Sequence, residues 1–323
     1  MRAVVALRAE PDDPLRAIEV RDRPRPPAAE GWELVRIKAA SLNHHDLWTA
    51  RGVGGPAQRF PVVLGSDGAG VTEDGTEVMV HGMVGDPDAG GGDETLDPAR
   101  TILGEDHDGT LAEWALVPRR NLVPMPPALT FEEAACLPGA WLTAYRMLFE
   151  KAGLEPGSTV LVQGAGGGVS TALTVLGSAM GHRVWVTSRS EERRARAVKL
   201  GASAAFAPGE RLPSRVDAAL ETVGASTWEH SVRSVRPGGR IVVAGATTGR
   251  YPRFDLNQIF FRQLSVVGVT CGTYRQLGRL ARFCVETGVR PVIDRTLPLE
   301  RVHDGFAALA GGAVFGKVVI TCR

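Results

Sequence analysis

Short apolar runs separated by turn residues dominate the N-terminal part of the chain. Runs rich in Val, Leu and Ile predict strands over residues 4–7, 32–40, 61–64 and 77–80. Clusters of Pro, Gly and Asp lie between these runs and indicate turns. Short, closely spaced strands of this kind predict a compact, partly open β-barrel. The Gly- and acid-rich segment 85–100 is predicted to be a solvated surface loop.

The hydrophobic pattern changes near residue 128, where strand-like runs begin to alternate with helical ones. Thr130 and Glu133 have the spacing of a capping box, which predicts the start of a helix. The predicted order is then strand 159–163, helix 169–180, strand 183–187, helix 191–200, strand 217–222, helix 226–234 and strand 240–244. This alternation predicts a parallel, doubly wound sheet. After Cys271 the predicted elements are helix 276–286, strand 291–296, helix 299–310 and strand 316–321.

Composition and charge are those of an ordinary folded protein. The 323 residues suffice for two domains, and a hydrophobic content of 44% excludes a disordered chain. The chain has 37 basic and 36 acidic residues, so its net charge is close to zero. Neither nucleic acid nor an anionic membrane is therefore an expected partner. No segment has the pattern of a signal peptide or a membrane span, so a cytoplasmic location is expected.

A glycine-rich segment follows the first strand of the predicted doubly wound sheet. Glycines allow the backbone to approach a pyrophosphate closely, and the next helix would present its N-terminus to the negative charge. Strand, glycines, helix and second strand occur in the order that a dinucleotide-binding fingerprint requires. The spacing departs from that fingerprint, because Val169 stands where a third glycine is usual. The residues predicted to bind the cofactor here are Gly164, Gly166, Gly167, Gly168 and Val169.

The end of the second strand indicates which dinucleotide binds. NAD-binding proteins usually carry a carboxylate there, which accepts a hydrogen bond from the ribose 2′-hydroxyl. Here Ser188 and Arg189 occupy that place, and no carboxylate precedes Glu191. A guanidinium suits a 2′-phosphate, so the predicted cofactor is NADP (NADPH). The alternative is that Arg189 is a solvated residue at the start of a helix.

Several motifs, taken in order, resemble the medium-chain dehydrogenase/reductase superfamily and in particular its zinc-free, quinone oxidoreductase-like branch. They are SLNHHDL (41–47), GSDGAG (65–70), LTAY (142–145), GAGGGVS (164–170), GGR (238–240) and GKVV (316–319). The resemblance implies a GroES-like, partly open β-barrel catalytic domain from residues 1–126 and 271–323. It implies a doubly wound Rossmann domain from residues 127–270, with cofactor and substrate held in a cleft between the two domains.

The chain departs from the zinc enzymes of this superfamily at each catalytic ligand. Where those enzymes have Cys, His and Cys, this chain has Asn43, Ser66 and Ala140. The family's structural zinc lobe needs four closely spaced cysteines, and segment 85–100 has none. The four cysteines of the chain match no zinc-binding spacing; they are Cys136, Cys271, Cys284 and Cys322. Zinc needs a suitable set of ligands, so no metal site is predicted.

Without zinc, the expected reaction is hydride transfer to an acceptor that is already electron-poor. Quinones and α,β-unsaturated carbonyls accept hydride and develop negative charge on a conjugated oxygen, which needs only a hydrogen-bond donor. By resemblance Asn43 faces this oxygen and donates through its amide; the alternative is that Asn43 caps a turn. His45 is a predicted donor or proton source, or else a ring packed at the cleft wall.

The resemblance assigns roles to further residues. Asp46 is expected to orient its neighbours. Lys317 is expected near the cofactor pyrophosphate, the alternative being a simple charge at the end of a strand. The full set of cofactor contacts implied by the resemblance beyond the glycine-rich segment is His44, Thr143, Gly245 and Lys317. No Tyr precedes Tyr145, so a tyrosine acid from the N-terminal part of the catalytic domain is excluded.

Three functions remain open at this point. The leading one is an NADPH-dependent reductase of quinones or conjugated enones. The others are a zinc-independent alcohol or ketone dehydrogenase, and an NADPH-binding sensor or structural protein with little turnover. The apolar run 264–270 lies late in the predicted sheet and would leave an exposed edge, which is usually paired or covered. The resemblance also implies that two copies join their sheets at this edge, so a homodimer is predicted.

Overall fold

A computed structural model describes residues 1–55 and 58–322. The chain divides into two compact units, residues 1–142 with 273–323 and residues 143–272. The first is called the barrel unit below and the second the dinucleotide unit. The predicted domain boundaries after residues 126 and 270 stay a proposal. Among the described residues, no helix is long and apolar enough to cross a membrane.

The barrel unit is built mainly from antiparallel strands. Its largest sheet has the order β10-β6-β5-β3-β18-β17, and β9 also pairs with β3. Smaller sheets are β2-β1-β4 and β7-β8. The strand bounds are β1 Arg2–Ala6, β2 Ile18–Asp22, β3 Trp32–Ser41, β4 Val62–Val63, β5 Gly68–Thr72, β6 Glu77–Val80, β7 Met83–Val84, β8 Thr101–Ile102, β9 Trp114–Pro118, β10 Leu122–Pro124, β17 Ile293–Pro298 and β18 Lys317–Thr321.

Short helices connect these strands. The α-helices are α1 His44–Ala50, α2 Phe131–Ala135, α8 Tyr274–Thr287 and α9 Val302–Ala310. Single turns of 3-10 helix cover Pro14–Ala17, Glu94–Leu96, Arg119–Asn121 and Leu299–Arg301, and a π-helical turn covers Leu137–Trp141. The predicted capping box of α2 is confirmed, since Glu133 N–H donates to Thr130 Oγ1 (3.2 Å) and Thr130 N–H donates to Glu133 Oε2 (3.0 Å).

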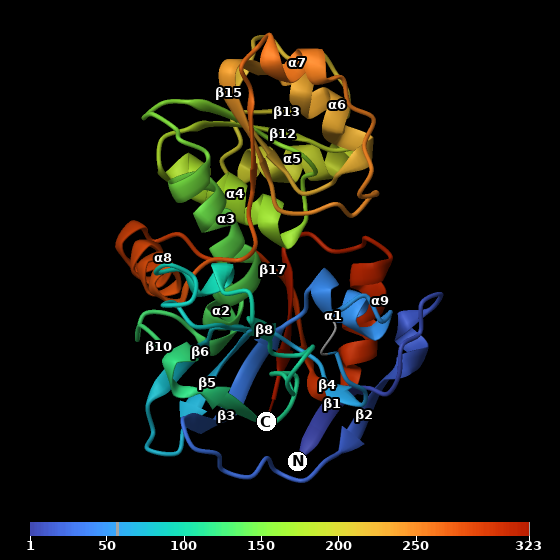
Figure 1. Ribbon diagram of the computed structural model, residues 1–323, viewed down its shortest axis with the longest axis vertical. Helices are drawn as coiled ribbons and strands as arrows, with labels where there is room; N and C mark the ends of the chain where they lie inside the picture. The colour runs from blue at the N-terminus through green and yellow to red at the C-terminus, as the bar shows by residue number, and fades with distance from the viewer. Residues whose placement is uncertain (56–57, 323) are drawn as a thin grey trace. The chain divides into compact units, whose positions relative to one another are not determined.

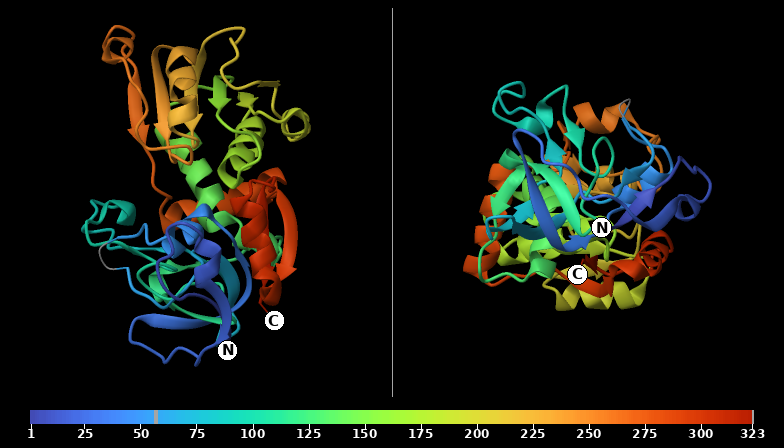
Figure 2. Two further views of the ribbon diagram at one scale, coloured as in Figure 1. Left: turned by 90° about the vertical axis from the view of Figure 1, so that its right-hand side faces the viewer. Right: turned by 90° about the horizontal axis from the view of Figure 1, so that it is seen from below.

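Both ends of the chain contribute to the barrel unit. Strand β18, near the C-terminus, pairs antiparallel with β3, and Val319 lies opposite Ser41. Figures 1 and 2 show the red C-terminal elements β17 and α9 beside blue N-terminal ones. A single apolar core joins them, in which Ile37, Leu64 and Phe306 are each at most 1% exposed. The folded barrel unit therefore depends on both chain segments.

The dinucleotide unit holds one six-stranded sheet with the order β13-β12-β11-β14-β15-β16, and every pairing in it is parallel. The predicted doubly wound sheet is thus confirmed. The strand bounds are β11 Thr159–Val162, β12 Arg183–Thr187, β13 Ala204–Phe206, β14 Val216–Glu221, β15 Val235–Val243 and β16 Ser265–Gly268. The helices are α3 Leu142–Arg146, which begins at the unit boundary, α4 Gly168–Ala179, α5 Glu191–Lys199, α6 Ala225–Ser234 and α7 Leu256–Phe260, with a π-helical turn at Met147–Lys151.

The strand order locates the place where a ligand would bind in this sheet. The chain runs outward from β11 through β12 to β13, then returns to β14 on the other side of β11. In open α/β sheets ligands bind at such a reversal, at the carboxyl ends of the strands. The glycine-rich segment follows β11 at this reversal, as a dinucleotide site requires.

Segment 85–100 differs from the predicted solvated loop. Glu94, Thr95 and Asp97 are at most 5% exposed. Two of these carboxylates accept hydrogen bonds from backbone N–H groups. Asp97 Oδ2 accepts from Asp86 N–H within the loop (2.7 Å), and Glu94 Oε1 accepts from the N–H of Tyr274 at the start of α8 (2.6 Å). Alternating acids and glycines do not reveal which carboxylates turn inward, so the prediction is wrong for this part of the loop.

Candidate functional site

The polar cluster of the barrel unit begins at the start of α1. Asn43 is the N-cap of this helix and has an extended backbone (φ −129°, ψ 156°). Its N–H donates to Asp46 Oδ2 (2.8 Å), while Asp46 Oδ1 accepts from Gly65 N–H (3.1 Å). Burial raises the pKa of Asp46 to about 6, against the opposing charges of His45 and Lys317. Asp46 therefore holds the Asn43 backbone against the Gly65 turn.

Lys317 brings a buried positive charge into the same cluster. Its Nζ donates to Asn43 Oδ1 (2.6 Å), to the carbonyl of Leu42 (2.8 Å) and to Asp67 Oδ2 (3.3 Å). Asp67 Oδ2 also accepts from Ser41 Oγ (3.0 Å). Lys317 and Asp67 are 2% and 1% exposed. The ammonium is thus directed at protein oxygens, and the expected contact of Lys317 with the cofactor pyrophosphate stays a prediction.

The Asn43 amide is held with its oxygen toward Lys317. An ammonium can only donate hydrogen bonds, so the atom facing it must be Oδ1. The other end of the amide, Nδ2, has a single long contact of 3.5 Å to the carbonyl of Ser41. Because that distance is at the limit of a hydrogen bond, Nδ2 retains its capacity to donate.

His45 pairs with a carboxylate that the sequence did not point to. Its Nε2 lies 2.8 Å from Glu105 Oε2, and Glu105 Oε1 accepts from the N–H of Gly55. Burial alone would lower the pKa of His45, but the bond to Glu105 and the negative charges of Asp46, Glu105 and Asp67 outweigh it, so the pKa is raised. His45 Nδ1 is buried and has no hydrogen-bond partner in the described part of the chain.

The glycine-rich segment of the dinucleotide unit has the form of a phosphate cradle. Gly164 and Gly166 have φ of +81° and +107°, which L side chains rarely adopt. Gly167 is the N-cap of α4, and a Cβ on Gly164 would lie 2.8 Å from Val223 Cγ2. The segment rests on Thr187 at the end of β12, which accepts from Gly164 N–H at Oγ1 (3.2 Å) and from Ala165 N–H at its carbonyl (2.7 Å).

Beneath this segment lies a buried hydrogen-bond network that sequence reasoning missed. Gln163 joins β11 to its neighbours: Oε1 accepts from Thr187 Oγ1 (2.7 Å), and Nε2 lies 3.0 Å from both His230 Nδ1 and Ser231 Oγ. Ser231 Oγ donates in turn to Glu221 Oε2 (2.7 Å). No spacing along the chain links these residues, since they come from the end of β11, from β12, from β14 and, for His230 and Ser231, from α6. The network locks together the strand ends on which the glycine-rich segment rests.

The turn after β12 presents Arg189 to solvent. Arg189 is exposed, and no hydrogen bond of its guanidinium is found among residues 1–55 and 58–322. Ser188 is buried; its Oγ accepts from Ser190 N–H (3.2 Å) and its carbonyl from Arg194 Nη1 (2.7 Å). The serine therefore shapes the turn, and the arginine is the group that could meet an anion.

The remaining predicted cofactor residues lie in separate elements. His44 is exposed on α1, where its ring stacks with that of Trp48 at a centroid distance of 6.4 Å. Thr143 lies in α3. Gly245 follows the carboxyl end of β15, where a Cβ would lie 2.8 Å from the carbonyl oxygen of Thr222.

Comparisons with known proteins identify the family. The "Alcohol dehydrogenase GroES-like domain" family matches residues 29–127, and the "Zinc-binding dehydrogenase" family matches residues 168–286. A zinc-type alcohol dehydrogenase-like protein of Schizosaccharomyces pombe is 32% identical over 318 residues, covering 90% of each chain. This chain belongs to the zinc-type alcohol dehydrogenase family of the medium-chain dehydrogenase/reductase superfamily.

Two further relatives of this medium-chain dehydrogenase/reductase carry different names. An acryloyl-coenzyme A reductase of Metallosphaera sedula is 30% identical over 322 residues and covers 94% of this chain and 96% of its own. A crystal structure described as an NAD-dependent alcohol dehydrogenase superposes with a TM-score of 0.91 at 36% identity, over 99% of both chains. The expected GroES-like and Rossmann architecture is confirmed.

The residues of this chain do not fit the catalytic zinc that the family name implies. Asn43, Ser66 and Ala140 offer neither thiolate nor imidazole, and Asn43 Oδ1 already accepts from the Lys317 ammonium, whose charge would repel a metal ion. Across residues 1–55 and 58–322, no group of three or more His, Cys, Asp or Glu side chains is arranged to hold a metal. No chemical step is therefore assigned to zinc.

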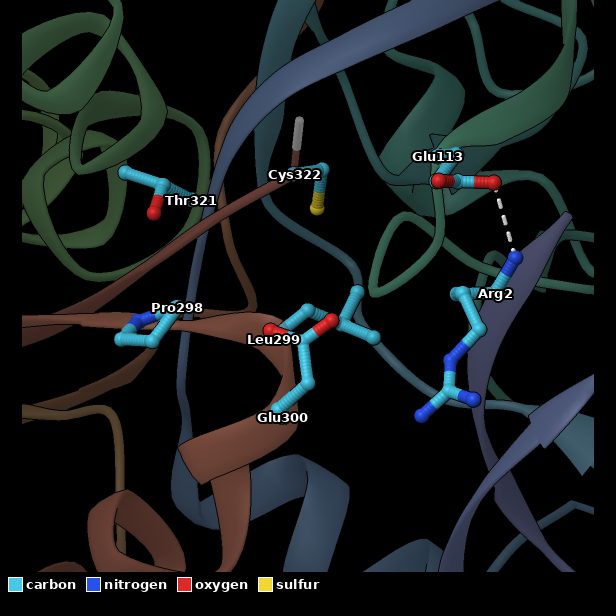
Figure 3. Close-up of a pocket in the computed structure, with 7 residues that line it drawn as sticks. All are labelled: Arg2, Glu113, Pro298, Leu299, Glu300, Thr321 and Cys322. Atoms are coloured by element: carbon cyan, nitrogen blue, oxygen red, sulfur yellow. Dashed lines mark hydrogen bonds between the residues drawn. The ribbon is translucent and has the colours of Figure 1, made fainter.

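A small pocket of about 50 Å³ lies elsewhere in the barrel unit. Its lining residues are Arg2, Glu113, Pro298, Leu299, Glu300, Thr321 and Cys322 (Figure 3). Arg2 N–H donates to Glu113 Oε2 (2.8 Å) across one side of it. Thr321 ends β18 whereas Lys317 begins it, and four steps along a strand separate the two by about 13 Å. The pocket is thus distinct from the polar cluster around Asn43.

We predict that Glu105→Gln lowers the pKa of His45, because the variant removes the negative charge and leaves only a neutral, weaker acceptor for the His45 ring. A raised pKa stabilises the fold below the ordinary value of 6.5, and this contribution is lost as the pH rises through the raised value. The variant should therefore lower the free energy of unfolding more at about pH 6 than at about pH 9.

The measurements are an NMR titration of ¹³C-labelled histidine and urea unfolding at both pH values. Asp106→Asn is the matched control, because Asp106 is the next residue and its Oδ2 accepts from Ile102 N–H rather than from His45. An unchanged His45 titration in Glu105→Gln would contradict the pairing.

Proposed function

We propose that this medium-chain dehydrogenase/reductase is an NADPH-dependent reductase of quinones or other α,β-unsaturated carbonyls that works without zinc. The observation that carries the proposal is the Asn43 amide, whose oxygen is held by Lys317 and whose Nδ2 is left to donate. A conjugated acceptor needs such a donor and no metal. The acryloyl-coenzyme A reductase relative supports this acceptor class, since an acryloyl group is an α,β-unsaturated carbonyl.

The dinucleotide unit would hold the cofactor. The cradle from Gly164 to Val169 suits the pyrophosphate because Gly164 and Gly166 turn the backbone at positive φ and α4 begins there. Arg189 would grip the 2′-phosphate, and Gly245 would lie along the dinucleotide at the carboxyl end of β15. When bound, NADPH supplies the hydride.

The barrel unit would stabilise the negative charge that develops on the substrate and would supply the proton. As hydride adds to the carbon β to the carbonyl, the negative charge moves to the carbonyl oxygen, and Asn43 Nδ2 donates to that oxygen. His45 then gives a proton to the reduced substrate. The bond to Glu105 raises the pKa of His45 and so favours the protonated ring, and Nδ1 is the ring atom not committed to Glu105. Asp46 holds the Asn43 backbone while this occurs.

A second candidate is an alcohol or ketone dehydrogenase. The 36% identity to a protein described as an NAD-dependent alcohol dehydrogenase favours it. The two candidates make opposite predictions: an alcohol dehydrogenase reduces the oxidised cofactor with a simple alcohol, whereas an enone reductase does not.

We predict that NADPH binds more tightly than NADH and that Arg189→Ala removes most of the difference. A charge-assisted bond to phosphate contributes about 1.5–3 kcal/mol, or roughly 10-fold to 150-fold in affinity. Fluorescence titration with both cofactors measures the ratio. Arg183→Ala is the control, since it removes the same charge from the opposite end of β12. Equal NADPH and NADH affinities in the parent would count against the assignment.

We predict that the protein oxidises NADPH with a quinone or enone and does not oxidise ethanol. Asn43→Ala should slow hydride transfer by about 100-fold, because the loss of an oxyanion donor costs about 2.7–4 kcal/mol. NADPH affinity should remain nearly unchanged. Stopped-flow absorbance at saturating NADPH measures the step, and elemental analysis tests for zinc. An unchanged rate would remove Asn43 from the mechanism, and efficient ethanol oxidation would overturn the proposed function.

We also propose a homodimer formed through the edge of the dinucleotide sheet. Strand β16 ends that sheet, and Val266 on it is 48% exposed. Large side chains in the segment that precedes β16 along the chain are exposed as well: Tyr251, Leu256, Phe260 and Phe261. Val266→Lys should shift sedimentation toward a monomer, because an edge lysine opposes strand pairing. Val198→Lys is the control, since Val198 is equally exposed (48%) but lies on helix α5. A monomeric parent at micromolar concentration would end this proposal.

A further inference from the structure

The buried ammonium of Lys317 has a protein oxygen for each of its three protons within the barrel unit. An ammonium has three protons and no acceptor, and Nζ has three oxygens within reach: Asn43 Oδ1 (2.6 Å), the Leu42 carbonyl (2.8 Å) and Asp67 Oδ2 (3.3 Å). The side chain is only 2% exposed. A phosphate group would have to displace one of these protein oxygens in order to bind.

The backbone delivers Lys317 to this place rigidly. Gly316 has a φ of +110°, and a Cβ there would collide with the Val292 carbonyl oxygen, so only glycine allows the approach. Lys317 N–H then donates to that carbonyl (2.8 Å), and Leu42 N–H donates to the carbonyl of Val318 (2.9 Å). These bonds fix the start of β18 against the residue that precedes Asn43.

The contact has two consequences for the Asn43 amide. Because the ammonium can only donate, it selects the amide orientation in which Oδ1 faces inward and Nδ2 faces away. A hydrogen bond from a cation also polarises the amide, which strengthens the N–H groups at its other end as donors. Asp67 Oδ2 supplies a negative charge next to this cation, which balances part of the buried charge.

We propose that Lys317 is a positioning residue for Asn43: a fixed internal cation that orients and polarises the Asn43 amide toward negative charge on the substrate oxygen. The proposal rests on the proposed function, because Asn43 has no oxyanion to meet unless a conjugated carbonyl is reduced. It assigns Lys317 a different partner from the pyrophosphate that the resemblance implied.

The first test needs neither cofactor nor turnover. The sequence has three asparagines, Asn43, Asn121 and Asn257, so ¹⁵N-asparagine labelling gives three resolvable side-chain amides. Lys317→Met should shift the Asn43 amide signals and leave those of Asn121 and Asn257 in place. Lys38→Met is the matched control, since Lys38 lies on the adjacent strand β3 of the same unit. An Asn43 signal unaffected by Lys317→Met would overturn the proposal.

The second test separates positioning from cofactor binding. Lys317→Met should bind NADPH within about twofold of the parent and slow hydride transfer to the acceptor by about 100-fold, as Asn43→Ala does. The double variant should be little slower than either single variant, because both remove the same interaction. A large loss of NADPH affinity with normal hydride transfer in Lys317→Met would show that Lys317 binds the pyrophosphate. If the rate losses of the two single variants multiply in the double variant, Lys317 acts independently of Asn43. Either result would overturn the proposal.

Chemical rescue keeps the proposal testable should Lys317→Met fail to fold. In Lys317→Ala, propylammonium replaces the lost three carbons and the charged nitrogen, and it should restore hydride transfer at least 10-fold. Tetramethylammonium at equal ionic strength should not, because it cannot donate a hydrogen bond. Equal rescue by both ions would overturn the proposal. If the parent reduces no conjugated carbonyl at all, the proposed function fails, and the asparagine signals still decide whether Lys317 holds Asn43.

Discussion

A buried cation joins the two ends of this chain. Lys317 stands at the start of the last strand, and its oxygen partners come from the segment after β3 and from Asp67 in the next turn. Removing one member of a buried charge pair typically costs about 3–5 kcal/mol, because the other charge is left without compensation. The placement of Asn43 therefore depends on its contact with Lys317, which lies 274 positions later in the chain.

Carboxylates fix loops throughout the structure by accepting backbone N–H groups. Asp46 holds Asn43 and Gly65, Glu105 holds Gly55, and Glu94 holds Tyr274. The last of these belongs to segment 85–100, which has no cysteine. Bonds to ionised acceptors are stronger than neutral ones, so a few such contacts can order a glycine-rich loop without a metal.

The dinucleotide unit uses the same device beneath its glycine-rich segment. Glu221 is fully buried, and its oxygens accept from the N–H groups of Val223 and Gly224 and from the hydroxyls of Thr227 and Ser231. These bonds satisfy the carboxylate, which is why its burial is tolerated. The ends of β11, β12 and β14 are thereby held in one arrangement. The glycine-rich segment rests on these strand ends, so its backbone is held in place as well.

The sequence by itself determined the elements that depend on local pattern. The capping box at Thr130, the alternation of strands and helices and the glycines after β11 are local signals, and the structure has them. Glu105, Gln163 and the inward turn of Lys317 were decided only by the tertiary structure. Each depends on a partner from a distant segment, and no periodicity or spacing records which buried polar groups the fold brings within hydrogen-bond distance.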